Sequence, residues 1–311
     1  MKQLLVIGGS YFAGRVFVEM LAPHGRYQIT VFNRGRLPMG MPAVAEIKGD
    51  REIGEQVAQR IPPRDWDVVV DFCGYAPAEI HSLLDNINGT IGHYIFISTT
   101  SIYDPAAPVP VVETAAKVSA PQPELGPFAD YGYQKWLAEG AVDTICRAKN
   151  VPYTILRPTI IYGRYNYAPR ESFLFDQAVT GRPFVVPEDP HVFYSFVWVE
   201  DLAQILIAAL ENPRLYGKAY NVASEEFFSY ATVVDVIEEV TGRAIQRRTA
   251  SMDEIIEKQI PMPFPPDMHL LYDGKQLNQL LSYAHAPLLV GMARTWTTYQ
   301  KVLAHRQAQI R

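Results

Sequence analysis

Short runs of consecutive apolar residues alternate with helical patterns along the first half of the chain. Continuous apolar runs are typical of strands that are buried on both faces of a sheet. The expected strands are 4–7, 29–32, 44–47, 68–70 and 94–97, and the clearest expected helices between them are 12–21 and 80–87. This alternation predicts an α/β domain whose parallel sheet is covered by helices on both faces.

The second half begins with a proline-rich stretch from Asp104 to Phe128, which we expect to be a long irregular loop. Loops of this length inside a compact domain are uncommon and are often functional. The pattern then predicts a helix over about 131–147, strands at 153–156, 196–199 and 220–222, and helices from about 201 and over 229–241.

The composition of the chain disfavours several classes of protein. The 311 residues are 48% apolar, which is enough for a full core, and the net charge of -5 is spread along the chain. Because no basic run reaches the density of a phosphate-binding patch, we do not expect nucleic acid to be the main partner. The apolar start of the chain is too short for a signal peptide, and no stretch approaches the roughly 20 apolar residues of a membrane span.

Only two cysteines occur, Cys73 and Cys146, so the chain has no disulfide framework and no Cys-x-x-Cys zinc motif. A reducing compartment is the simple interpretation. We therefore expect a cytoplasmic protein without a metal site.

A glycine-rich turn follows the first expected strand and opens the first expected helix. Its sequence is Gly8-Gly9-Ser10-Tyr11-Phe12-Ala13-Gly14. At this position of a Rossmann-type sheet, the pyrophosphate of a dinucleotide lies at the helix N-terminus. Gly8 permits the tight turn, Gly9 lets the backbone approach the phosphates, and Gly14 lets the helix pack closely on the sheet. The alternative is a structural turn without a ligand.

The end of the second strand bears on which dinucleotide is bound. A carboxylate about 20 positions after the glycines would bind the adenine ribose hydroxyls, but Asn33 and Arg34 stand there. A guanidinium can pair with a 2′-phosphate, so the sequence favours NADP over NAD, unless Arg34 is only a surface residue. Asp50, after the third strand, either bonds the adenine amino group or caps the next helix.

Tyr131 and Lys135 are four residues apart at the start of an expected helix, so they face the same side. A nearby ammonium lowers the pKa of a phenol from its usual value near 10. The pair could then remove a proton from an alcohol while a hydride leaves its carbon. The same spacing also occurs as an ordinary surface pair, and the hydroxyls at the end of the fifth strand favour chemistry.

The chain resembles the extended short-chain dehydrogenase/reductases, the NAD-dependent epimerase/dehydratase family, and also an atypical branch with a Gly-Gly-x-x-Phe-x-Gly turn. Besides that turn, the matching segments are 67–71, 98–103, 131–135, 156–159, 162–163, 199–203 and 220–224.

The resemblance implies a role for several residues. It makes Thr99 the catalytic hydroxyl, Tyr131 the acid and base, and Lys135 the group that lowers the pKa of Tyr131 and binds the nicotinamide ribose. The cofactor residues that it implies, together with those of the turn and strand ends, are Gly8, Gly9, Ser10, Tyr11, Phe12, Gly14, Asn33, Arg34, Asp50, Cys73, Gly74, Lys135, Pro158 and Ile160. We interpret Cys73 as a packing residue beside the cofactor.

Three positions depart from the family pattern. Tyr11 replaces the middle glycine of the turn, and Thr100-Ser101 replace the acidic pair of the dehydratases, which argues against dehydration. The arginine that pairs with the diphosphate of nucleotide sugars is missing near 193–195, where Trp198 takes the place of a histidine; Arg170 and Arg182 are alternative candidates.

The sequence therefore predicts a Rossmann-type doubly wound parallel sheet with a smaller C-terminal α/β substrate lobe. The dinucleotide-binding domain is expected over 1–163 and about 195–222, and the substrate lobe over about 164–194 and 223–311. The expected function is an NAD(P)-dependent epimerase or reductase of a sugar-like alcohol or ketone, for which we favour a nucleotide sugar, and a homodimer is the oligomer that we consider. The alternative is a non-catalytic, cofactor-sensing or RNA-associated protein of the same superfamily.

Overall fold

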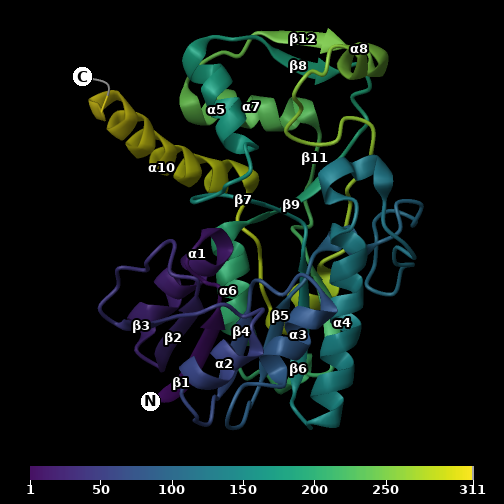
Figure 1. Cartoon of the computed structure of the whole chain (residues 1–311). Coiled ribbons are helices and arrows are strands. Elements are labelled where there is room, and N and C mark those ends of the chain that lie inside the picture. The colour runs from purple at the N-terminus through teal and green to yellow at the C-terminus, as the bar shows by residue number, and fades with distance from the viewer. Residues whose placement is uncertain (310–311) are drawn as a thin grey trace. The chain divides into compact units, whose positions relative to one another are not determined.

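The computed structural model describes the secondary structure of residues 1–309 and the burial of the side chains of residues 1–305. The chain divides into two compact units, which are treated separately below (Figure 1). Unit 1 comprises Met1–Thr159, Glu200–Ala223 and Tyr272–Tyr283, and unit 2 comprises Ile160–Val199, Ser224–Leu271 and the residues from Ala284 onward. The predicted roles of dinucleotide-binding domain and substrate lobe stay predictions, and residues 310 and 311 of the predicted lobe lie outside the described residues.

The central sheet of unit 1 has seven parallel strands in the order β10-β6-β5-β4-β1-β2-β3. This confirms the predicted doubly wound sheet. Its inner strands are buried on both faces, as the continuous apolar runs indicate, whereas the edge strand β3 is largely exposed beyond Val44. Their bounds are β1 Lys2–Ile7, β2 Tyr27–Asn33, β3 Val44–Lys48, β4 Val68–Asp71, β5 Tyr94–Ile97, β6 Tyr153–Pro158 and β10 Lys218–Val222.

Helices α2, α3 and α4 pack against one face of this sheet, where Val57, Leu83 and Val142 join a core cluster with Leu5 and Ile7 of β1. Helix α1 connects β1 to β2, in the opposite direction along the sheet, so a right-handed crossover places it on the other face. The helices are α1 Phe12–Leu21, α2 Gly54–Arg60, α3 Pro77–Leu84, α4 Tyr131–Ala148, α6 Val199–Ala209 and α9 Lys275–Leu281, with 3₁₀ turns η1 Ala22–His24, η2 Thr100–Ile102, η3 Pro123–Phe128 and η4 Pro213–Leu215.

The strand order reverses between β1 and β4, which are neighbours in the sheet. The chain leaves β1 toward one edge of the sheet and leaves β4 toward the other, so the loops after the two strands diverge. Backbone bonds fix both exits: Gly8 N donates to Phe32 O at 2.9 Å, and Phe72 N donates to Ile7 O at 3.0 Å. A crevice at this point is where open α/β sheets bind ligands.

A buried ion pair joins α4 to the central sheet in unit 1. Arg157 of β6 donates from Nε to Glu139 Oε1 at 3.0 Å and from Nη2 to Glu139 Oε2 at 2.6 Å. Its Nη1 donates to the Tyr103 hydroxyl at 2.9 Å and to the Glu113 carbonyl at 3.1 Å. Both charged side chains are at most 5% exposed, so Arg157 connects the helix, the sheet and the long loop.

Asn221 of β10 extends this network into the proline-rich loop. Tyr103 donates to Asn221 Oδ1 at 2.6 Å, and Asn221 Nδ2 donates to the carbonyls of Val111 at 3.0 Å and Asp273 at 3.2 Å. The loop is therefore held at its middle, and its end forms the 3₁₀ turn η3 where we expected irregular chain. The Leu-Arg-Pro and Tyr-Asn-Val motifs thus have a structural explanation that does not depend on catalysis.

Unit 2 contains a three-stranded sheet in the order β11-β9-β7 and a two-stranded parallel sheet of β8 and β12. Stacked and tilted aromatic rings form much of its core, with Phe196 at 5.0 Å from Phe264 and 5.5 Å from Phe228 between ring centroids. Its elements are β7 Ile160–Tyr162, α5 Glu171–Thr180, β8 Phe184–Pro187, β9 Tyr194–Trp198, β11 Phe227–Phe228, α7 Tyr230–Thr241, β12 Arg247–Ala250, α8 Met252–Glu257 and α10 Leu288–Gln309. None of the helices formed by residues 1–309 has the length and hydropathy needed to cross a membrane.

Glu171, the first residue of α5, is a buried acid in unit 2. Its Oε1 accepts from Gly163 N at 3.0 Å, and both of its oxygens accept from Asn166 Nδ2, at 3.1 and 3.0 Å. Burial raises the pKa of Glu171 to about 7, although these donors act to lower it. The carboxyl therefore holds the segment between β7 and α5 and titrates near neutral pH.

The raised pKa of Glu171 predicts a pH-dependent stability. Between 4.5, the ordinary value, and about 7, the folded state binds a proton that the unfolded state has lost, so the free energy of unfolding falls as pH rises through that window. Relative to Glu171→Gln, which cannot titrate, the wild type should lose roughly 3 kcal/mol. Urea unfolding at pH 4.5, 6 and 7.5 checks this. Parallel curves for the two proteins would contradict it.

Candidate functional site

The glycine turn has the backbone geometry that only glycine adopts without strain. Gly8 and Gly9 have φ of +88° and +71°, and a Cβ on Gly9 would lie 2.6 Å from Val6 Cγ1. A Cβ on Gly14, in the first turn of α1, would lie 2.6 Å from the Gly9 Cα. The three glycines therefore bring the turn, the strand and the helix into close contact, as the sequence predicted.

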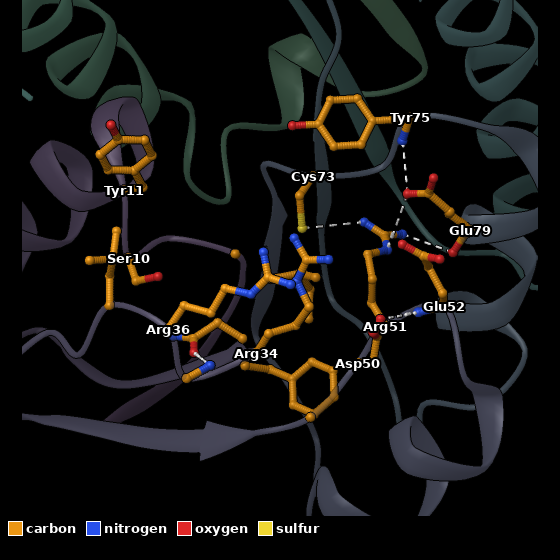
Figure 2. Close-up of a pocket in the computed structure, with 17 residues that line it drawn as sticks. Ser10, Tyr11, Arg34, Arg36, Asp50, Arg51, Glu52, Cys73, Tyr75 and Glu79 are labelled. Atoms are coloured by element: carbon orange, nitrogen blue, oxygen red, sulfur yellow. Dashed lines mark hydrogen bonds and ion pairs between the residues drawn. The ribbon is translucent and has the colours of Figure 1, made fainter. Parts of the chain in front are cut away.

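A pocket of about 310 Å³ lies at this turn, in unit 1 (Figure 2). The turn, the ends of β2 and β3, and the segment after β4 all contribute to it. Seven of the predicted cofactor residues line it, namely Gly8, Ser10, Tyr11, Asn33, Arg34, Asp50 and Cys73. Among the residues described, the predicted positions outside this lining are Gly9, Phe12, Gly14, Gly74, Lys135, Pro158 and Ile160.

The pocket offers N–H donors to a ligand. Within residues 1–309, Asn33 Nδ2 and Arg51 Nε are buried nitrogens without a hydrogen-bond acceptor, and both residues line the pocket. Figure 2 shows the side chains of Arg34 and Arg36 reaching toward the middle of the pocket. Donors and guanidinium groups around an apolar floor suit a ligand that is rich in hydroxyl and phosphate oxygens.

Arg51 is a pocket residue that sequence reasoning missed. It is 6% exposed, donates to Asp71 Oδ1 at 2.5 Å and to the Glu79 carbonyl at 2.8 Å, and lies 3.8 Å from Cys73 Sγ. Burial acts to lower the pKa of Arg51, but the surrounding groups, Asp71 first, together raise it above the usual arginine value. Its position directly after Asp50, at the end of a strand, was the available signal. Arg36, Glu52, Tyr75 and Glu79 were missed as well.

Two alternatives left open by the sequence can now be compared with the geometry. Asp50 does not cap the next helix: Ile53 is the N-cap residue of α2, while Asp50 Oδ1 accepts from Glu52 N at 3.1 Å. Burial and the Asp71 carboxylate together raise the pKa of the Cys73 thiol to about 11, against the opposing effect of Arg51. A thiol with so high a pKa is a poor nucleophile at neutral pH, in line with packing.

Lys135 lies on α4 and is 2% exposed. Its Nζ donates to the carbonyls of Gly74 at 2.7 Å and Ile97 at 2.6 Å, so the ammonium joins the chain after β4 to the end of β5. The Phe96 ring centroid lies 4.3 Å from Nζ. Burial lowers the pKa of Lys135 to about 8, against the opposing charges of Asp71 and Glu139. The lysine is thus a fixed cation at the carboxyl ends of the strands.

Tyr131 begins α4, one helical turn before Lys135, and is 37% exposed. Thr99 follows β5 and is the N-cap of η2, where its Oγ1 accepts from Ser101 N at 3.1 Å and donates to Ser101 Oγ at 3.2 Å. Because Lys135 bonds to the last residue of β5, the fold brings Thr99 and the start of α4 to the same end of the sheet. Their catalytic roles remain predictions.

Within the described residues, no group of three or more histidine, cysteine, aspartate or glutamate side chains is placed to hold a metal ion.

Comparison with known proteins finds a family model that matches a little less than half of the chain. Residues 80–223 match the model of the NAD dependent epimerase/dehydratase family. This confirms the resemblance predicted from the motifs, over a segment that includes Thr99, Tyr131 and Lys135. The glycine turn lies before the matched segment.

Two curated relatives and a solved structure are also similar to the chain. The chain is 26% identical over 245 residues to the 41 kDa chloroplast stem-loop binding protein b of Arabidopsis thaliana, covering 74% of this chain and 60% of that protein. It is 28% identical over 178 residues to an uncharacterized UDP-glucose epimerase of Bacillus subtilis, covering 55% of this chain and 53% of that protein. The chain thus spans about half to three fifths of the length of these relatives.

Among solved structures, the UDP-glucuronic acid 4-epimerase of Bacillus cereus in complex with NAD has the same fold. The TM-score is 0.75 at 18% identity, and the match covers 96% of this chain and 99% of that one.

Proposed function

We propose, on the premise that residues 80–223 carry the NAD dependent epimerase/dehydratase domain, that this protein is an NAD(P)-dependent epimerase or reductase of a sugar-like alcohol or ketone. The observation that carries the proposal is the placement of Lys135. A buried ammonium bonded to a carbonyl after β4 and to the last carbonyl of β5, one turn from Tyr131, stands where open α/β sheets bind their ligands.

The residues of the pocket fit a dinucleotide. Asn33 Nδ2, which has no hydrogen-bond acceptor, and Arg51 Nε, whose nearest carboxylate oxygen is Glu79 Oε2 at 3.9 Å, are suited to ribose or phosphate oxygens. The cradle of Gly8, Gly9 and Gly14 leaves the N-terminus of α1 open to a pyrophosphate. Asp50 and Arg34, at the ends of β3 and β2, would hold the adenosine half.

A bound nicotinamide would supply the hydride chemistry, by taking a hydride from a carbinol carbon or giving one to a ketone. Tyr131 would move the matching proton on the substrate oxygen, and Lys135 would stabilise the phenolate through its charge. Thr99 would donate a hydrogen bond to the same oxygen. An epimerase returns the hydride to the other face of the same carbon, whereas a reductase transfers it once.

A nucleotide sugar is the substrate class that we favour. The relatives named as UDP-sugar epimerases support it, and Thr100-Ser101 in place of an acidic pair disfavours dehydration. Arg294 is a candidate for the diphosphate in addition to Arg170 and Arg182, because its guanidinium lies 5.4 Å from the Trp198 ring in unit 2.

The proposal is tested by identifying what the purified protein carries and converts. Mass spectrometry of the denatured protein should detect NAD(H) or NADP(H), and incubation with a panel of UDP- and dTDP-sugars should give an epimer or a reduced product. A protein that binds no dinucleotide in a titration and converts none of the panel would refute the proposal.

We expect NADPH to bind more tightly than NADH because Arg34 can pair with the 2′-phosphate. Arg34→Ala should weaken NADPH binding by about tenfold or more, the usual worth of a hydrogen bond between charged groups, and leave NADH nearly unchanged. Fluorescence titration measures both. Arg26→Ala is a matched control, because Arg26 precedes the same strand at its opposite end and pairs with Glu211. Equal affinities for the two dinucleotides in the wild type would exclude the preference.

A cofactor-sensing or RNA-associated role is the second candidate, favoured by the 26% identity to a stem-loop binding protein. The net charge of -5 argues against it. RNA retained at physiological salt, together with no turnover on any sugar nucleotide, would favour this role over the first.

A further inference from the structure

Tyr75 is a half-exposed residue that the proposed chemistry has not used. It follows β4 in the sequence Phe72-Cys73-Gly74-Tyr75, is 50% exposed and lines the pocket. Figure 2 shows its ring at the rim of the pocket beyond Cys73, with the hydroxyl directed across the opening and away from Glu79. A large aromatic side chain in this position is available to a ligand.

The backbone that carries Tyr75 is held on both sides. Lys135 Nζ donates to the carbonyl of Gly74, and Tyr75 N donates to Glu79 Oε2 at 3.0 Å. A Cβ on Gly74 would lie 2.7 Å from Ile80 Cδ1 and 2.9 Å from Phe96 Cε2, so the chain passes too close to the core to shift inward. The ring therefore stands on a fixed base.

The ring of Tyr75 also contacts the predicted catalytic residues. Its centroid lies 6.4 Å from that of Tyr131, and Lys135 Nζ lies 5.5 Å from it. Arg34 and Asp50 line the same pocket from the ends of β2 and β3. Tyr75 thus marks the end of the pocket that is nearest to Tyr131 and Lys135.

We propose that Tyr75 is a positioning residue whose ring face packs against the nicotinamide of the dinucleotide and holds it beside Tyr131 and Lys135. This inference rests on the proposed function, because it requires a bound dinucleotide. The adenosine half, at the ends of β2 and β3, does not reach the ring. The contribution of Tyr75 therefore depends on whether the ligand contains nicotinamide.

The test compares two ligands that differ in the nicotinamide, while both contain the adenosine, the diphosphate and the second ribose. NADPH and 2′-phospho-ADP-ribose, which lacks nicotinamide, are titrated into the full-length wild type, Tyr75→Ala and Tyr75→Phe. Tyr75→Ala should weaken NADPH binding by about tenfold, the scale of an aromatic stacking contact, and change the affinity for 2′-phospho-ADP-ribose less than twofold. Tyr75→Phe keeps the ring and should bind both ligands like the wild type. The emission of bound NADPH should shift toward that of free NADPH in Tyr75→Ala alone.

If Tyr75 only supports the pocket structurally, Tyr75→Ala should weaken the binding of both ligands by the same factor. That outcome would overturn the inference, and so would unchanged NADPH binding in Tyr75→Ala. If Tyr75→Ala does not fold, Tyr75→Leu takes its place with the same expectation. A wild type that binds neither these ligands nor NADH refutes the proposed function itself, which separates that failure from the failure of the inference.

Discussion

Replacement of Tyr131 by phenylalanine should lower turnover by about 10²- to 10⁴-fold, the usual contribution of a positioned acid or base. The variant loses only the hydroxyl that moves the proton, so the ring contact with Tyr75 remains. Dinucleotide affinity should therefore stay within about twofold of the wild type, because the pocket is unchanged. Turnover is measured on whichever substrate the wild type accepts, and affinity by fluorescence titration.

Tyr133→Phe is the matched control for this experiment. Tyr133 lies two residues further along α4, so its side chain leaves the helix on a different side. It should keep wild-type turnover. A Tyr131→Phe protein that retains wild-type rates would show that this phenol is not the acid or base.

Removal of the Glu139 carboxylate should destabilise the protein by about 3–5 kcal/mol, because it leaves the buried Arg157 guanidinium without its counter-charge. Glu139→Ala loses both hydrogen bonds from Arg157, and Glu139→Gln retains one acceptor and should lose less. Urea unfolding followed by tryptophan fluorescence measures the change.

A surface ion pair on the same helix provides the comparison. Arg147 pairs with Asp143 on α4, and its side chain is 67% exposed. Arg147→Ala should change the free energy of unfolding much less than Glu139→Ala does, because exposed pairs contribute little to stability. A Glu139→Ala protein as stable as Arg147→Ala would show that the buried pair is not needed for stability.

Much of unit 1 could be predicted because its signals are local. Apolar runs long enough to cross a sheet gave β1, β2 and β5 nearly to the residue, and the glycine turn placed the start of α1 at Phe12. The predicted order of strand and helix is confirmed in the seven-stranded sheet. The pairing of β9 was not foreseen, because its apolar run looks like the others; it joins β7 and β11 in a separate sheet.

Those residues of the candidate site could be predicted whose position is evident from a short segment of the sequence. Asn33, Arg34 and Asp50 sit at strand ends, and the topology collects strand ends at one edge. Arg51 and Tyr75 could not be found this way, since their importance comes from partners far along the chain: Asp71 for the arginine, and Tyr131 and Lys135 for the tyrosine. Glu171 was hidden for a different reason: its partners Gly163 and Asn166 are near in sequence, but an acid is common at the start of any helix and does not indicate burial.

The hydrogen bonds from Asn221 and Arg157 divide the proline-rich loop into parts that should differ in how well they tolerate inserted residues. The carbonyls of Val111 and Glu113 are held by side chains of β10 and β6. Lengthening the chain between them would break bonds that are buried in the sheet. The exposed residues 105–106 and 119–121 carry no such bonds. Insertions, tags or a grafted peptide are therefore best placed in these two outer segments, where the added chain can extend into solvent without moving β6 or β10.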